Sequence, residues 1–299
     1  MNLANQQGPL EEEVIKKGSR AKIAVIKIEG PIINTAGKNM FGGETETVIT
    51  SRIREELMRA ETDKSVKAVI LKINSPGGAV TTCDIIRDEI MKFKKRTGVP
   101  VIAEMGDIAA SGGVYLSTSA DYIVAHPTTV TGSIGVITQT VNAKALLEKI
   151  GIKDETIKSG AKKDMGSPFR GFTEEERVLY TEVIMGMYER FIAVILEGRK
   201  GLDENKLREI ADGRIFIAKK ALEYGLIDFI GYSDDTIRIA EEKTGITNAT
   251  IVCYKRSGQY IANIYSQSHV SNYGTVNLFN INASMLESMH GVSFMYMMQ

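Results

Sequence analysis

Short apolar runs alternate along the chain with stretches in which apolar residues recur every three or four positions. The runs are rich in β-branched residues and end at glycine, proline or serine, which predicts strands. Strands are expected at residues 22–28, 66–73, 99–105, 122–125 and 155–158, with a last one around Val252. The three-to-four spacing predicts helices over residues 46–60, 80–95, 111–119, 143–150, 203–211, 218–223 and 233–243.

Thr173 and Glu176, three residues apart, carry the signature of a capping box, which predicts the start of a long helix that ends near Arg199. Because strands and helices alternate, we expect an α/β fold with a mostly parallel sheet, helices on both faces and right-handed crossovers. Many unrelated α/β enzymes share this pattern, so the function has to be argued from particular residues.

The chain has 299 residues, with 37 basic and 37 acidic side chains and a formal net charge of zero. This balance disfavours a nucleic-acid partner, since domains that bind by bulk charge are usually strongly basic. Cys83 and Cys253 are too few for a disulfide framework or a zinc site, and the three histidines lack metal-binding spacing. We therefore expect no metal and no cofactor. No apolar run reaches the ~18 residues of a spanning helix, so we expect the chain as given to be soluble.

Composition divides the chain into a polar N-terminal segment, residues 1–20, one domain, residues 21–256, and a C-terminal tail, residues 257–299. Histidine apart, Glu287 is the only charged residue of the tail, whose last residues are apolar and aromatic. Leaving such side chains in water forgoes roughly 1.5–3 kcal/mol for each large residue that could be buried. We expect the end of the tail to dock on protein, either at a subunit interface or in an apolar substrate groove.

Three loops follow predicted strands, where the sites of open α/β sheets form. In the first, Gly77 and Gly78 would let backbone N–H groups face an oxyanion or a phosphate, although a simple strand–helix turn is an alternative. The second places Ser111 and Gly112 at a helix start, where the serine is either a nucleophile or an N-cap. Ser133, in the third loop, is a second nucleophile candidate, a supporting residue or part of a turn.

A serine nucleophile needs a general base. His126 precedes a proline at a predicted strand end, and we interpret it as a loop residue. The stronger candidate is a lysine among the three in residues 157–164. Such a base must be neutral, so its pKa has to fall from about 10.4 toward the working pH, as burial can bring about. On the residues alone, a solvated basic loop stays open as the alternative.

The ordered series INSPGG, AASGGVYLSTSAD, TGSIGVI, IKSGAKKD, SPFR, ADGRIF and AKKALEYGLID resembles the signal peptide peptidase A family of Ser/Lys proteases. The resemblance runs from about residue 22 to residue 234. It implies the fold of the Clp-protease and crotonase superfamily and a homo-oligomeric ring. Apolar surface expected on the long helix around residues 180–196 agrees with an oligomer.

The resemblance also implies the substrates and the setting. Substrates would be apolar peptides such as remnant signal peptides, bound in a groove of Ala, Val, Ile and Met side chains. The family is membrane-associated on the extracytoplasmic face, and most members begin with an anchor that this chain does not show. Carried over to this sequence, the family's site residues are the nucleophile Ser111, the general base Lys163, the supporting Ser133, and the oxyanion-hole donors Gly78 and Gly112. Gly77 and Lys162 are the neighbouring alternatives in register.

Four other functions stay open. A Clp-type Ser-His-Asp peptidase is disfavoured because no histidine occurs near residues 135–136, where that family places it. A crotonase-like acyl-CoA enzyme would use the oxyanion donors without a nucleophile, and a CoA-binding assay would reveal it. A capsid-maturation protease of phage type would share the dyad. An inactive scaffold would fail to label with a serine-reactive probe.

Overall fold

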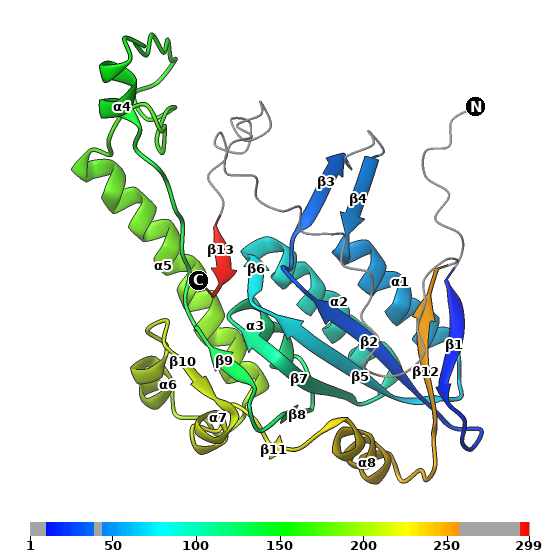
Figure 1. The fold of residues 1–299 in the computed structure, drawn as a ribbon. Coiled ribbons are helices and arrows are strands. Elements are labelled where there is room, and N and C mark those ends of the chain that lie inside the picture. Colours follow the sequence, from blue (N-terminus) through cyan, green and yellow to red (C-terminus); the bar gives the residue numbers. More distant parts are fainter. Residues whose placement is uncertain (1–9, 39–43, 257–293, 299) are drawn as a thin grey trace, which may run out of the picture.

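The structure, a computed structural model, describes residues 10–38, 44–256 and 294–298. A large sheet runs through it, in the order β1-β12-β2-β5-β7-β8-β11, with β9 beside β7 and β10 beside β9 (Figure 1). The pairs from β12 to β11 are parallel, which confirms the mostly parallel sheet. The strands are β1 (Glu11–Lys16), β2 (Lys22–Glu29), β5 (Val66–Ser75), β7 (Val101–Ala110), β8 (Tyr122–Ala125), β9 (Val130–Gly132), β10 (Ile215–Ile217), β11 (Phe229–Ile230) and β12 (Thr250–Lys255).

The central strands are apolar on both faces, because each face is covered by other parts of the chain. Ile70 of β5 lies in register with Val25 and Ile102 and packs on one face. Leu71, the next residue, belongs to the larger cluster on the opposite face. These side chains are almost fully buried, and each contributes roughly 1.5–3 kcal/mol by leaving water. The near-continuous apolar pattern of residues 66–73 therefore reflects burial on two sides.

Helices cover both faces of the sheet, as the alternating pattern predicts. Helices α1, α2 and α3 pack with the cluster around Leu71, whereas Ile239 and Ala240 of α8 pack with the cluster around Ile70. Helix α2 ends at Gly98, whose left-handed backbone (φ 67°) closes the last turn. The helices are α1 (Ile49–Thr62), α2 (Val80–Thr97), α3 (Gly112–Ser117), α4 (Lys144–Lys149), α5 (Glu174–Gly198), α6 (Glu204–Ile210), α7 (Ala218–Glu223) and α8 (Ser233–Thr244).

Three local predictions differ from the structure. Residues 155–158 form no strand, because they are exposed and lie beside no partner strand that could satisfy their backbone. The helix expected from residue 46 begins at Ile49, since β4 (Glu44–Val48) pairs with β3 (Asn34–Lys38) as a hairpin. Strand β1 was not anticipated: its charged sequence hides the antiparallel pairing with β12 that places it at the sheet edge.

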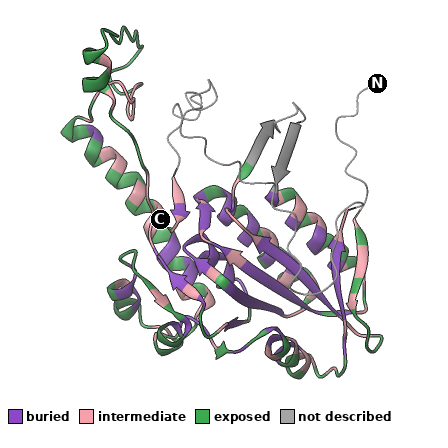
Figure 2. Cartoon of the chain, in the orientation of Figure 1, coloured by how far each residue is buried: buried purple, intermediate pink, exposed green. Residues whose placement is uncertain are grey.

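One part of the molecule stands away from the sheet. We call it the arm: residues 138–183, comprising α4, the loops on either side of it and the first half of α5 (Figure 1). Figure 2 shows it largely exposed, whereas the second half of α5 buries one face against the body, at Phe191, Ile192, Val194 and Ile195. The capping box predicted at Thr173 and Glu176 is confirmed at the start of α5. Large apolar side chains are nevertheless exposed on the arm: Val141, Leu146, Ile150, Ile152, Ile157, Val178 and Val183.

The end of the chain returns to the body. Strand β13 (Met295–Met297) pairs antiparallel with β6 (Gly77–Ala79), the short strand that directly follows β5 (Figure 1). Residues 257–293, the rest of the expected tail, lie outside the described residues. Across the described ranges, no helix is both long and apolar enough to cross a membrane.

Candidate active site

The three loops singled out in the sequence meet at one edge of the sheet. Ser75 at the end of β5 is in register with Ala109 near the end of β7, and Ala110 is in register with Gly132 of β9. Because these strands are parallel, their carboxyl ends point the same way and the loops after them converge. The parallel sheet alone therefore brings together the glycine pair after β5, the serine after β7 and the serine after β9.

Ser111 has the geometry of a nucleophile held in a sharp strand-to-helix turn. Its backbone is in a rare conformation (φ 52°, ψ −110°), the residue is fully buried, and its hydroxyl has no hydrogen-bond partner in the part of the chain that the structure describes. It precedes α3 but makes no side-chain capping bond, which argues against the N-cap alternative. A hydrogen bond from the Ser111 amide to the Gly132 carbonyl, 2.8 Å long, holds the turn in place. Such stored strain is typical of catalytic turns.

The glycines beside Ser111 are packed too closely for any side chain. A methyl group built on Gly112 would lie 2.7 Å from Cys83 Sγ and 3.1 Å from the backbone nitrogen of Gly78. One built on Gly77 would lie 2.8 Å from the Gly112 nitrogen, and Gly77 has a positive φ of 109°. The predicted oxyanion-hole residues Gly78 and Gly112 are thus neighbours, with bare backbone between them.

Ser133 lies in the third loop, one residue after the carbonyl that anchors Ser111. It too has a positive φ (51°) and is 9% exposed, and its amide donates to the Arg214 carbonyl over 2.7 Å. The contact through Gly132 couples the turns of the two serines. Ser133 is accordingly placed to support Ser111 rather than to form a separate site.

The C-terminal strand β13 lies between β6 and Ile137, beside these residues. We call the space between β6 and Ile137 the groove. Met295 exchanges hydrogen bonds of 3.0 and 3.1 Å with Ile137 on one side, and β13 pairs with β6 on the other. Tyr296 is the residue in register with Gly78. A methyl group on Gly77 would lie 1.9 Å from the Tyr296 carbonyl oxygen, which places that oxygen beside the candidate oxyanion donors. An extended peptide, here the chain's own end, thus presents a carbonyl to the site.

The side chain of Tyr296 fills an aromatic pocket next to the groove. Its ring is fully buried, stacks on Tyr115 at 5.0 Å and lies 4.5 Å from Phe191, and its hydroxyl donates to the Met187 carbonyl over 3.0 Å. Burial, followed by the bond to the Asp84 carboxylate, raises the pKa of the Tyr115 phenol, so this wall stays neutral. The aromatic rings of Tyr115 and Phe191 line this pocket, and the expectation of a groove of Ala, Val, Ile and Met side chains did not include them.

Lys163 does not join the other site residues within one chain. It is exposed on the arm, in the segment between α4 and α5, and Figure 1 shows this segment at the end of α5 far from α3. His126 is no substitute, because its ring nitrogen is bonded to Glu104 (3.1 Å) in a cluster with Ser233, the first residue of α8. A single chain thus holds the serine and the oxyanion donors, but no base beside them in the part that is described.

The three lysines of this segment differ in their partners. Lys158 donates to Asp164 over 2.7 Å, and Lys162 pairs with Glu175 at 2.5 Å. Among the described residues, Lys163 has no carboxylate within ion-pair distance. Since a base must be able to release its proton, Lys163 is better suited to the role than either neighbour. Within the described ranges, no group of three His, Cys, Asp or Glu side chains could hold a metal ion.

Comparison with known proteins identifies the family. The sequence profile of peptidase family S49 matches residues 93–247, and that of Clp proteases matches residues 32–150. The chain belongs to peptidase family S49. It is 40% identical to a "Putative signal peptide peptidase SppA" of Enterococcus faecium, over 82% of this chain and 71% of that protein. The predicted Clp-related α/β fold is thereby confirmed.

Two longer relatives point to the same chemistry. The chain is 36% identical to "Protease 4" of Haemophilus influenzae and 35% identical to "Serine protease SPPA, chloroplastic" of Arabidopsis thaliana. These matches cover 74% and 77% of this chain, but only 34% and 33% of the two relatives. The S49 member described here is therefore a serine peptidase, and it spans about a third of the length of these two proteins.

Two parts of the site were not found from the sequence. The aromatic pocket comes from Tyr115 on α3 and Phe191 on α5, which are 76 positions apart and read as ordinary core residues. Ile137, which forms the second wall of the groove, follows β9 in a stretch with no regular pattern. The available signal was the apolar C-terminus, which was expected to dock in a groove or at an interface.

Proposed function

We propose that this protein is an endopeptidase in which Ser111 is the nucleophile and Lys163 of a neighbouring copy is the general base. Gly78 and Gly112 donate their backbone N–H groups to the oxyanion, and Ser133 orients the lysine amine. The observation that carries the proposal is the position of Tyr296. Its carbonyl oxygen lies beside Gly77, next to the backbone nitrogen of Gly112. Gly112 directly follows Ser111, whose buried hydroxyl has no hydrogen-bond partner among the described residues.

The chemistry balances with these groups alone. Ser111 Oγ attacks the peptide carbonyl carbon while its proton passes to the neutral amine of Lys163. The oxyanion that forms accepts hydrogen bonds from Gly78 and Gly112, where the N-terminus of α3 adds to the favourable field. The C–N bond then breaks, and the Lys163 ammonium protonates the leaving amine. Water then attacks the acyl-enzyme and gives a proton to Lys163. The ester C–O bond breaks, the Lys163 ammonium returns the proton to Ser111 Oγ, and the carboxylic acid product leaves.

A second copy of the chain supplies the base in this proposal. Lys163 lies on the arm, where Ile157 is 99% exposed and several other large apolar side chains face solvent. Exposed apolar surface of this extent usually marks an interface. An arm that packs on the next subunit would bury these side chains and bring Lys163 toward that subunit's Ser111. A closed ring would repeat this contact at every site.

The groove indicates what kind of peptide is cut. It binds its occupant in extended form through backbone pairing on two sides, and it buries one large side chain among aromatic rings. Substrates should therefore be unfolded and apolar, with an aromatic residue before the cleaved bond. The name of the Enterococcus relative mentions signal peptides, which are apolar, and we therefore propose remnant signal peptides as the substrates. Such substrates would bring the enzyme to the extracytoplasmic face of a membrane.

Subunit mixing tests the proposal. Ser111→Ala and Lys163→Ala are each expected to be inactive when made separately. Co-expressed in equal amounts, they should regain about one quarter of the wild-type activity, because that share of sites would combine an intact serine with an intact lysine. No recovery would contradict a base supplied by a neighbour, and full activity of Lys163→Ala alone would contradict the dyad.

A further inference from the structure

The loop that carries Lys163 is closed by its own polar contacts. We call residues 158–167 the lysine loop. The Lys158 ammonium donates to the Ala161 carbonyl (3.0 Å) and to Asp164 Oδ1 (2.7 Å), which closes the loop across Lys163. The Lys163 amide also donates to the Gly160 carbonyl over 3.1 Å. The place of Lys163 therefore depends on how Asp164 is held.

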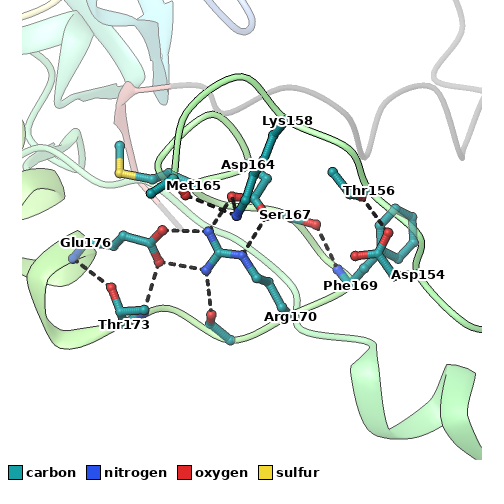
Figure 3. Close-up of polar contacts among 12 residues, drawn as sticks. Asp154, Thr156, Lys158, Asp164, Met165, Ser167, Phe169, Arg170, Thr173 and Glu176 are labelled. Atoms are coloured by element: carbon teal, nitrogen blue, oxygen red, sulfur yellow. Dashed lines mark hydrogen bonds and ion pairs between the residues drawn. The ribbon is translucent and has the colours of Figure 1, made fainter.

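Arg170 holds Asp164 and ties the lysine loop to α5 (Figure 3). Its guanidinium donates two hydrogen bonds to the Asp164 carboxylate, of 2.8 and 2.7 Å. It donates two more, of 2.8 and 2.5 Å, to Glu176 in the first turn of α5. Glu176 also accepts from the Thr173 amide in the capping box. The planar guanidinium thus bridges two carboxylates, with a pair of hydrogen bonds to each. A lysine ammonium cannot reproduce this geometry.

Arg170 also keeps the two carboxyl groups near Lys163, those of Asp164 and Glu176, in their ionised form. Asp164 directly follows Lys163, and hydrogen bonds from Arg170 and then Lys158 hold the pKa of the Asp164 carboxyl well below its usual range. Hydrogen bonds from Arg170 and then Thr173 lower the pKa of Glu176 to about 2. Both carboxylates are therefore ionised, and both are compensated. The charged groups in and beside the loop are Lys158, Lys162, Asp164, Arg170, Glu175 and Glu176.

We propose that Arg170 is a positioning residue for Lys163. By occupying Asp164 it keeps that carboxylate from pairing with Lys163, and by binding Glu176 it fixes the lysine loop on α5. Lys163 can then reach the neighbouring Ser111 as a neutral amine. This inference rests on the proposed function, in which Lys163 is the base.

The test is the pH dependence of kcat/KM in Arg170→Met. We expect kcat to fall about 10–100-fold and the acid limb of the profile to move about one pH unit higher, because the Asp164 carboxylate, then held by Lys158 alone, would stabilise the ammonium form of Lys163. In Arg170→Lys the charge is kept, so the acid limb should stay while kcat is only partly restored. An unchanged profile in Arg170→Met would overturn the inference.

A double variant separates charge from tethering. In Asp164→Asn/Arg170→Met the acid limb should return to its wild-type position although kcat stays low, and a limb that stays shifted would overturn the charge argument. Arg208→Met is the matched control, because Arg208 on α6 also bridges two glutamates, Glu189 and Glu204, but outside the arm. It should leave the profile unchanged.

Two further outcomes keep the test decisive. Should Arg170→Met fail to fold by circular dichroism, Arg170→Lys decides, and wild-type kcat in that variant would overturn the inference. An inactive Lys163→Ala beside an unaltered Arg170→Met would overturn this inference alone. An active Lys163→Ala would overturn the proposed function, and this inference with it.

Discussion

Ser111 holds a left-handed backbone that residues with a β-carbon rarely adopt, at a cost of about 1–3 kcal/mol. The rest of the turn imposes it: the amide of Ser111 is bound to Gly132, and its carbonyl accepts from Tyr115 in α3. The result is a buried hydroxyl that no other described residue binds, which is unfavourable for stability. The proposed role of Ser111 as a nucleophile accounts for this conformation better than stability does.

The two adjacent lysines should behave differently when replaced by alanine. We expect Lys163→Ala to lose about 10⁴–10⁶-fold in kcat, as bases of such units do. Lys162→Ala should stay within about threefold of wild type, because its ammonium only pairs with Glu175 on the exposed side of the loop. Hydrolysis of a fluorogenic peptide measures both. A dead Lys162→Ala beside an active Lys163→Ala would assign the base to Lys162.

Gly112 is expected to tolerate no side chain. In Gly112→Ala the new methyl group would press on Cys83 Sγ at 2.7 Å and displace the Gly112 N–H from the oxyanion. We expect kcat to fall at least about 10²-fold, with a smaller change in KM. Gly135→Ala is the control, because a methyl group there has nothing nearer than 3.9 Å. Equal kcat in the two variants would mean that Gly112 donates nothing to the transition state.

At the scale of elements, β13 lies where a substrate strand would lie. Removing residues 294–299 should open the groove and raise the cleavage rate of short peptides several-fold, since the tail would no longer compete for β6 and Ile137. Peptide kinetics and sedimentation of the shortened and full-length proteins measure the effect. A shortened protein that dissociates without faster cleavage would instead assign the tail to a subunit interface.

A buried ionic cluster couples α8 to the sheet. Glu104 of β7 is fully buried and binds His126, Lys72 of β5 and Ser233 of α8. Burial alone would raise the pKa of Glu104, but the bonds from His126, Lys72 and Ser233 outweigh it and lower the pKa. The stability that this carboxylate contributes is thus present above its ordinary value of 4.5 and is lost as the pH falls through the lower folded value.

Glu104→Gln should therefore cost about 3 kcal/mol at neutral pH, because it removes the carboxylate that compensates the buried Lys72 ammonium. The difference in Tm from wild type should shrink as the pH falls below 4.5, because the carboxylate is protonated first in the unfolded chain and, at its lower folded pKa, in the native protein. Thermal unfolding at pH 7 and at pH 4 measures this. Glu61→Gln, which breaks an exposed pair with Arg96, is the control and should cost under about 1 kcal/mol. A constant difference across pH would contradict the role of Glu104.

The sequence was informative where the local pattern and the burial agree. Residues 66–73 and the capping box at Thr173 are strong local signals, and both elements formed as predicted. Strand β1 was missed because an edge strand bears charged residues and depends on β12, which lies more than 230 positions away. The separation of Lys163 from Ser111 within one chain was not predictable either, because the order of motifs along a sequence does not fix how far apart they lie in the fold.

At the scale of the whole molecule, the arm exposes large apolar side chains that the described part of the chain does not cover. We expect the protein to sediment as a homo-oligomer at micromolar concentration, because the apolar side chains of the arm would otherwise remain in water. Ile157→Asp should weaken the assembly and lower the activity together, since Ile157 is fully exposed in one chain. Sedimentation velocity and peptide hydrolysis on the same samples test this. A 32.8 kDa particle with full activity would contradict both the oligomer and the shared site.

If the site is shared between copies as proposed, the separation of Ser111 and Lys163 within one chain has a consequence for the cell. A subunit newly released from the ribosome would carry a nucleophile without its base, and so would be latent until it meets its copies. Latency of this kind needs no propeptide and no inhibitor: dilution is enough to maintain it, and crowding of subunits ends it. The protease would thus be harmless during its own synthesis and become active in proportion to its assembly.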